Sequence, residues 1–241
     1  MALQELGAGR RRDVVATSPV LYIAAKPPVA GSVKTRLAQA IGLDAATSLY
    51  AAFVHDIAAE VRGGSLPAGW FLPSEPDWQP PALGSQQVVT RWQNGSTWSE
   101  RQANLFRDSF EEGIAATVIV ASDSPQVAGS GMRAALDALA DADVVLGPVL
   151  DGGYYLLGWR GDHDIVRGIE MSTPRACADI IERARGLKLA LRLLPETFDV
   201  DEVGDLERLS AAAAVLPHLR ATRAALAAAS ERSLGTDMSA R

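Results

Sequence analysis

The chain has 241 residues and a formal net charge of -6, a length that suffices for one substantial α/β domain with a buried core. This acidic balance argues against general nucleic-acid binding, because neutralising backbone phosphates requires a basic surface. The single cysteine, Cys177, excludes an intramolecular disulfide, and no Cys/His cluster has the spacing of a zinc site. We therefore expect a cytoplasmic protein with no nucleic-acid partner.

The first 18 residues include three consecutive arginines but no apolar run of the length found in signal peptides. We expect residues 1–18 to be a flexible tail and residues 19–241 to form one domain. No stretch approaches the roughly 20 apolar residues of a membrane-spanning helix. The sequence therefore predicts no membrane partner.

Strand and helix patterns alternate in the first half of the chain. In chain order they predict a strand over 20–25, a loop over 26–33, a helix over 35–41, a second helix reaching residue 61, strands over 69–72 and 87–92, and a helix over 99–110. Asp44 is expected to cap the second helix, and Gly63 and Gly64 to end it. Residues 73–81 are rich in proline and predict an irregular surface loop.

The same alternation continues in the second half. The patterns predict a strand over 117–121 that is buried on both faces, a helix over 125–140, strands over 143–146 and 154–159, a helix over 174–185, a strand over 189–194 and a terminal Ala-rich helix that ends near Ser230. Such alternation is typical of an α/β fold with a mostly parallel central sheet flanked by helices.

A basic loop follows the first predicted strand, where ligands of open α/β sheets commonly bind. Gly31 allows the backbone to approach a ligand, and the helix that follows offers N–H groups to an anion. Lys26 and Lys34 add positive charge, and Arg36 is able to grip phosphate oxygens with two nitrogens. The loop suits a polyphosphate, although an ordinary surface loop with solvated basic residues explains it equally well.

Acidic residues follow two later predicted strands. Asp123 follows Ser122 at the end of the strand over 117–121. Asp199 and Asp201 alternate along an extended segment, so that both point to one side. Carboxylates in such places coordinate Mg²⁺ or Mn²⁺ together with phosphates. The alternatives are that Asp123 caps the next helix and that the segment 199–201 is a solvated acidic turn.

Asp151, Gly152 and Gly153 form a third loop in front of two tyrosines. Paired glycines permit a tight turn or a close approach to a ligand. Tyr154 and Tyr155 have the properties to stack on a ring, but packing in the core is the favoured interpretation of each residue taken alone.

Five segments together resemble a known family. They are KPPVAGSVKTRL (26–37), SDSP (122–125), LGPVLDGGYY (146–155), MSTP (171–174) and DVD (199–201). In this order they resemble the GT-A-like transferases called DUF2064, or radical-SAM/selenodomain-associated transferase 1, which are related to 2-phospho-lactate guanylyltransferase and molybdenum-cofactor guanylyltransferase. The resemblance covers about residues 20 to 210 and implies a single-domain GT-A, or nucleotide-diphospho-sugar transferase, fold.

The resemblance also implies roles for individual residues. It assigns phosphate binding to Lys26, Gly31, Lys34 and Arg36. It assigns a site for Mg²⁺ or Mn²⁺ to Asp123 and Asp201. The acceptor side is formed by Asp151, Gly152, Gly153 and Tyr154. Three positions depart from the usual family pattern. Glu202 begins the segment EVGDL where relatives read TPEDL, Met171 stands where relatives often have Trp, and Arg175 where His is frequent.

Two reactions and one binding role are compatible with these residues. A glycosyltransferase would move a sugar from a nucleotide sugar to a small acceptor, with Asp151 as the candidate base. A guanylyltransferase-like nucleotidyltransferase would release pyrophosphate from a nucleoside triphosphate, with Lys34 helping to spread the developing negative charge. A non-catalytic nucleotide-binding module is the third hypothesis.

Overall fold

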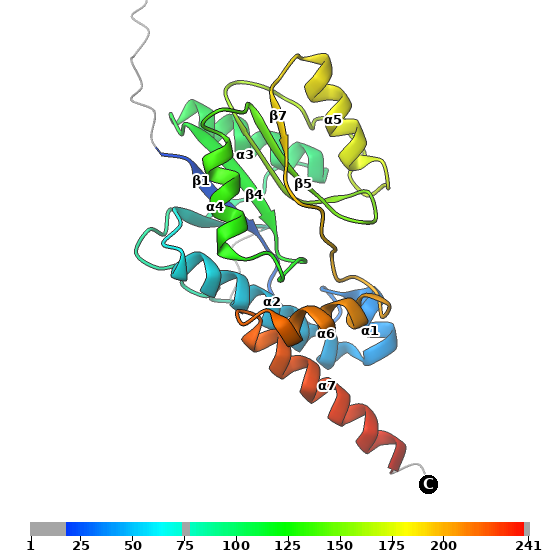
Figure 1. Ribbon diagram of the computed structural model, residues 1–241. Coiled ribbons are helices and arrows are strands. Elements are labelled where there is room, and N and C mark those ends of the chain that lie inside the picture. Colours follow the sequence, from blue (N-terminus) through cyan, green and yellow to red (C-terminus); the bar gives the residue numbers. More distant parts are fainter. Residues whose placement is uncertain (1–17, 74–77, 239–241) are drawn as a thin grey trace, which may run out of the picture.

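The computed structural model describes residues 18–73 and 78–238, and Figure 1 shows their arrangement. Of the expected tail, residues 1–17 lie outside the described residues. In the described residues, seven strands form one sheet in the order β3-β2-β1-β4-β6-β5-β7. The strands are β1 Val20–Ala24, β2 Ala68–Leu72, β3 Arg91–Trp92, β4 Ala116–Ala121, β5 Val144–Pro148, β6 Tyr154–Arg160 and β7 Leu191–Leu193. Strand β6 pairs antiparallel with β4 and β5, and the other pairs are parallel, which confirms the mostly parallel sheet.

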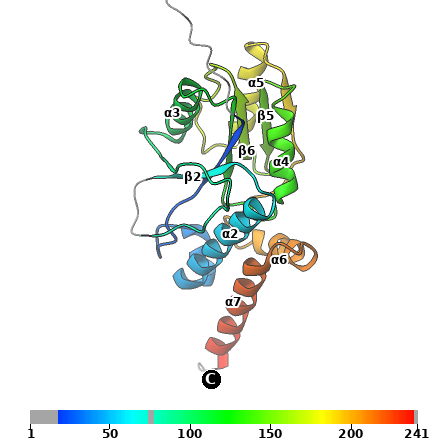
Figure 2. The ribbon, with the colours of Figure 1, turned by 90° about the vertical axis from the view of Figure 1, so that its left-hand side faces the viewer.

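Helices cover both faces of this sheet. They are α1 Thr35–Ile41, α2 Leu43–Gly63, α3 Trp98–Glu111, α4 Gly129–Ala138, α5 Ala176–Gly186, α6 Asp205–Val215 and α7 Arg220–Met238. Leu21 and Ile23 of β1 belong to the core cluster that contains α2 and α4 side chains, whereas Val20 and Tyr22 belong to the cluster that contains α3 and α5 side chains. Alternate residues of a strand point to opposite faces, so the sheet is buried on both sides. Figure 2 shows α3 and α4 on opposite sides of it.

The start of α2 differs from the expectation. Asp44 lies inside the first turn, and the N-cap is Gly42, whose φ of 86° is left-handed. Gly42 is also the C-cap of α1, so the two helices share a single connecting residue. Glycine tolerates this backbone conformation, and no residue remains between the helices to act as a separate side-chain cap.

Two predicted elements are shorter in the structure. The strand predicted over 87–92 is reduced to Arg91–Trp92, with one isolated bridge between Gln87 and Ala68. The helix predicted over 125–140 begins at Gly129, because the chain first makes a turn in which the Val127 N–H donates to the Ser124 carbonyl at 3.2 Å.

The prediction of a single terminal helix is wrong, because the chain forms α6 and α7 instead. Pro217 lies between them and has no N–H to continue a helix. The residue before it, Leu216, has φ −89° and ψ 110°, the extended conformation that a following proline favours. Helix α7 also runs beyond Ser230, to Met238. Of the helices in the described residues, none has both the length and the apolar character needed to cross a membrane.

Candidate functional site

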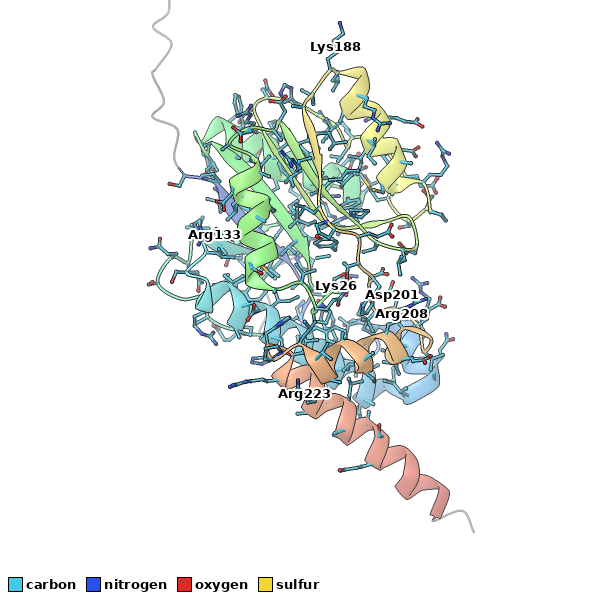
Figure 3. The ribbon with its side chains drawn as sticks, viewed as in Figure 1. Lys26, Arg133, Lys188, Asp201, Arg208 and Arg223 are labelled. Carbon is cyan, nitrogen blue, oxygen red and sulfur yellow. The ribbon has the colours of Figure 1, made fainter. Side chains whose placement is uncertain are left out.

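The three predicted loops meet at one edge of the sheet. Strands β1, β4 and β5 run in the same direction, so the segments that follow them emerge at the same edge. The acidic segment 199–201 passes there as well, since the Val200 N–H donates to the Asp123 carbonyl at 3.1 Å. Figure 3 shows Lys26 and Asp201 in this region, between the sheet above and α1 and α6 below. The segments that the sequence singled out therefore share one place in the fold.

Lys34 is the centre of the charged cluster. Its Nζ lies 2.5 Å from Oδ1 of Asp123 and 2.8 Å from Oδ1 of Asp201, and its side chain is only 4% exposed. Lys34 is also the N-cap of α1 and has a φ of 47°, which is uncommon for a residue with a Cβ. One buried ammonium thus joins the first loop to both predicted metal ligands.

Electrostatics keep this cluster ionised. Burial by itself lowers the pKa of Lys34, but Asp123 and Asp201 together raise it above its ordinary value. For Asp201 the signs are reversed. Burial by itself raises its pKa, but Lys34 and then Arg36 lower the pKa below the ordinary value of an aspartate. At neutral pH the contact between Lys34 and Asp201 is therefore an ion pair.

Arg36 holds the outer side of the cluster. Its Nη2 lies 3.0 Å from Oδ2 of Asp201 and its Nη1 lies 2.9 Å from Oε1 of Glu202, while 65% of its side chain remains exposed. Glu202 is one of the positions that depart from the family pattern, and here it supplies a carboxylate to Arg36. The guanidinium thus bridges two acids with two different nitrogens.

Two further residues of the first loop are open to solvent. Lys26 and Gly31 are exposed. Gly31 has a φ of 82°, and a Cβ added there would meet no atom within 4 Å. Its conformation favours glycine, and the space next to it is free for a ligand.

Asp151 and Asp199 extend the acidic side of the cluster. Burial is the main reason why the pKa of Asp199 rises to about 6, and the nearby charges of Asp151 and then Asp201 raise it further. Asp151 is exposed, and its Oδ1 accepts a hydrogen bond from the Gly153 N–H at 2.8 Å. The residue predicted as the base therefore lies beside the other acids of the site.

Gly152 and Tyr154 contact protein atoms. Gly152 has a φ of 91°, and a Cβ there would lie 2.0 Å from the Pro174 carbonyl oxygen, so close packing alone requires glycine at this position. Tyr154 packs against the core cluster around α3 and α5, and its hydroxyl bonds to Gln102 and lies 3.4 Å from Met171 Sδ. Tyr155 is 5% exposed, which confirms core packing for that tyrosine.

The sequence did not point to Tyr50, which connects two of the loops. The Lys26 N–H donates to its hydroxyl at 2.9 Å, and the hydroxyl lies 3.0 Å from Oγ of Ser122, the neighbour of Asp123. The Tyr50 ring is buried in α2, and the Lys34 Nζ lies 6.0 Å from its centroid. A tyrosine on the apolar face of a helix resembles any core aromatic, so only its hydroxyl partners reveal the connection.

The carboxylates suit a metal ion that binds together with phosphates. Within the part of the chain that the structure describes, no group of three or more His, Cys, Asp or Glu residues is arranged to hold a metal. Asp123 and Asp201 nevertheless both reach the same point, the Lys34 ammonium. Mg²⁺ usually takes one or two carboxylates and completes its shell with water and substrate phosphates. The donor set therefore fits a divalent cation that shares its ligands with a bound anion.

Two cavities lie near the site. A cavity of 370 Å³ opens beside Arg36 and Glu202 and is continued by Gln39, Ala40 and Val203. A larger cavity of 620 Å³, between the α1–α2 junction, α6 and α7, is lined mainly by apolar side chains and does not reach the Lys34 cluster. The candidate site borders the smaller cavity, because the ion-paired Arg36 and Glu202 of the charged cluster line it.

Comparisons with known proteins agree with this architecture. A family model described as "Uncharacterized protein conserved in bacteria (DUF2064)" matches residues 70–173. A crystal structure from Desulfovibrio desulfuricans G20, described as a candidate nucleotide-diphospho-sugar transferase, is 30% identical with a TM-score of 0.79, and the match covers 87% of this chain and 94% of that chain. No curated protein matches.

A more distant structure shares the fold alone. It is a cytidylyltransferase from Leptospira borgpetersenii serovar Hardjo-bovis (strain JB197), 12% identical with a TM-score of 0.51, and the match covers 90% of this chain and 95% of that chain. The identity and coverage of the Desulfovibrio protein, together with the family model, extend the resemblance seen in the five sequence segments to most of the chain. The chain belongs to the DUF2064 family and has a nucleotide-diphospho-sugar transferase fold.

Proposed function

We propose that the protein is a divalent-metal-dependent nucleotide-diphospho-sugar transferase that moves a sugar from a nucleotide sugar to a small acceptor. The observation that carries the proposal is the contact of Lys34 with both Asp123 and Asp201 at the carboxyl edge of the sheet. Phosphate-binding and metal-binding groups are thereby joined in one cluster. The description of the Desulfovibrio protein as a candidate nucleotide-diphospho-sugar transferase supports the same class.

The cations of the first loop hold the diphosphate in this proposal. Lys26 is exposed at the edge of the site and Arg36 is 65% exposed, so both are accessible to an anion. Gly31 leaves open space beside the loop, so phosphate oxygens are able to approach the backbone. Lys34 completes the set from the buried side and stabilises the negative charge that develops on the leaving diphosphate.

Asp123 and Asp201 would hold the Mg²⁺ or Mn²⁺ ion, each through a carboxylate oxygen. When bound, such a cation supplies positive charge to the diphosphate as the bond to the sugar breaks. Tyr50 positions the two loops, because its hydroxyl joins the Lys26 N–H to Ser122.

Asp151 is the proton acceptor in this proposal. The acceptor hydroxyl attacks the anomeric carbon, its proton passes to an Asp151 carboxylate oxygen, and the bond between that carbon and the diphosphate oxygen breaks with its electron pair on the diphosphate. Asp151 is exposed and lies near Asp199, so it is reachable from solvent by an acceptor. Gly153 keeps the carboxylate in place through its N–H.

The charge balance of the site favours a nucleotide sugar over a nucleoside triphosphate. Three cations face five carboxylates, because Asp151, Asp199 and Glu202 accompany the two metal ligands. A triphosphate carries more negative charge than the diphosphate of a nucleotide sugar, and acids beside it oppose binding. The second candidate, nucleotidyl transfer with release of pyrophosphate, keeps its support in the three basic residues of the first loop.

A product assay with Mn²⁺ tests the proposal. Purified protein is incubated with a panel of nucleotide sugars and nucleoside triphosphates together with small acceptors that carry hydroxyl or phosphate groups, and nucleoside diphosphate and pyrophosphate are measured separately. Release of nucleoside diphosphate from a nucleotide sugar, dependent on Mn²⁺, is expected. Release of pyrophosphate alone would replace glycosyl transfer with nucleotidyl transfer. Nucleotide binding that ignores Mn²⁺ and yields no product would identify a binding module.

A further inference from the structure

The buried cation of the site occupies a place that a metal ion would need. The Lys34 Nζ lies within 2.8 Å of oxygens from both Asp123 and Asp201, and almost none of the lysine side chain is exposed. Oxygen ligands surround Mg²⁺ at about 2.0–2.1 Å. A divalent cation held by the same two oxygens would therefore lie next to the ammonium, and two cations so close repel strongly.

We propose that the Lys34 ammonium and a divalent cation compete for the Asp123 and Asp201 carboxylates, so that metal binds tightly only together with an anion that takes over Lys34. The inference rests on the proposed function, because the anion is the diphosphate of the nucleotide sugar. In the ligand-free protein Lys34 is the counter-ion of the two acids. In the complex Lys34 is a counter-ion of the phosphates.

The lysine is suited to such an exchange. Its ammonium sits on a flexible four-carbon stem, so the charge can move while the backbone stays in place. The backbone of Lys34 is already fixed at φ 47° at the start of α1, with the side chain directed at the acids. The loop that leads up to it is exposed at Gly31, where an added Cβ would meet no atom within 4 Å.

The exchange makes metal and nucleotide binding cooperative. Metal without an anion must displace the ammonium from Asp123 and Asp201, and an anion without metal must separate Lys34 from the same two acids. When both bind, each of the five charged groups has a partner of opposite sign. Linkage then requires that metal tightens nucleotide binding by the same factor as nucleotide tightens metal binding, typically about 5- to 150-fold.

Titration of the purified protein with Mn²⁺ alone, followed calorimetrically, tests the competition. Lys34→Met removes the competing charge and keeps an unbranched side chain, so Mn²⁺ is expected to bind about tenfold more tightly or better. Lys34→Arg keeps the charge and should stay within about threefold of the wild type. Lys188→Met, an exposed site at the top of the molecule in Figure 3 and well away from Asp201, should not change Mn²⁺ affinity. Unchanged or weaker Mn²⁺ binding by Lys34→Met would overturn the proposal, and so would equal tightening by Lys34→Arg.

Thermal unfolding keeps the test decisive if Lys34→Met is unstable. Without Lys34 the two acids repel, so the variant is expected to melt at a lower temperature than the wild type and to be stabilised more than the wild type by Mn²⁺. Equal stabilisation of both proteins by Mn²⁺ would count against competition.

The test of competition is independent of catalysis. Tighter Mn²⁺ binding by Lys34→Met with no turnover of any nucleotide sugar would reject the proposed function and retain the competition. Turnover of a nucleotide sugar by the wild type, with no change in Mn²⁺ affinity in Lys34→Met, would retain the proposed function and reject the competition.

Discussion

Two parts of the molecule hold carboxylates through different kinds of partner. In α2, Asp56 is 3% exposed, and its two oxygens accept hydrogen bonds from the N–H groups of Ala221 and Thr222 at 2.9 and 2.8 Å. At the sheet edge, Asp123 and Asp201 are partly exposed and are held by the side-chain ammonium of Lys34. Backbone partners belong to the fold, whereas a lysine side chain can move.

The difference separates a structural acid from acids that are able to exchange partners. Asp56 accepts hydrogen bonds from N–H groups in the first turn of α7, which have no partner within the helix. Its negative charge also interacts favourably with the positive end of the helix dipole. Replacing it should change stability and leave ligand binding intact. Replacing an acid at the sheet edge should do the opposite, because the acids themselves are partly exposed and the site has more than one cation.

The largest effect is expected for Asp123→Asn. The amide keeps the shape of the side chain but loses the charge that attracts both Lys34 and a metal ion, so Mn²⁺-dependent turnover should fall by about 10²- to 10³-fold. Thermal unfolding should change little, because the side chain is 43% exposed. Turnover of nucleotide sugars and circular dichroism are measured on the same preparation. Retained turnover would remove Asp123 from the mechanism.

Asp56→Ala should lower stability and leave nucleotide binding unchanged. It leaves two N–H groups of the α7 first turn without their acceptors, so the free energy of unfolding should fall by about 2 kcal/mol. Asp137→Ala is the control, because Asp137 is an exposed helical aspartate on α4. Urea unfolding gives the stability, and a thermal shift with nucleotide gives the binding. A loss of nucleotide affinity in folded Asp56→Ala would erase the distinction between the two regions.

Arg36→Lys sharpens the description of the sheet edge. The guanidinium reaches Asp201 and Glu202 with separate nitrogens, and a lysine has no such fork. We expect nucleotide affinity to fall about tenfold, because two-nitrogen recognition of phosphate oxygens is lost while the charge remains. Stability should hardly change, since exposed ion pairs contribute little. Calorimetric titration with a nucleotide sugar measures the affinity, and an unchanged value would exclude Arg36 from the phosphate site.

The sequence predicted much of the fold from local signals. The apolar run 117–121 became the buried strand β4, and the helix predicted over 35–41 has the same bounds as α1. Errors arose where a neighbouring element decides the structure. Pro217 was visible, but the division into α6 and α7 also depends on Asp56, which lies about 165 positions away and caps α7. Gly42 serves two helices at once, which no single-helix pattern reveals.

The residues of the candidate site could be predicted from the sequence, but the ion pairs between them could not. Positions after parallel strands identified Lys34, Asp123 and Asp201 as neighbours, because strand ends of one direction share an edge. Their mutual ion pairs could not be read from the chain, since contacts across 167 positions depend on side-chain packing. Tyr50 was missed for the same reason: its hydroxyl meets Ser122 only after α2 docks on the sheet.

The smallest expected effect concerns Asp199 and depends on pH. The pKa of Asp199 rises from the ordinary 3.8 to about 6 in the folded protein, so the folded state holds the proton more tightly than the unfolded state. Above pH 6 the folded protein must bear an ionised carboxylate that burial, Asp151 and Asp201 disfavour, whereas below about pH 4 both states are protonated and the cost disappears. Asp199→Asn removes the charge, and because the carboxyl is partly exposed and screened by water we expect a gain of only about 1 kcal/mol at pH 7.5 and none at pH 4. Urea unfolding at these two pH values measures the difference. A gain that is the same at both would show that packing, and not the repulsion among the three acids, decides the stability at this position.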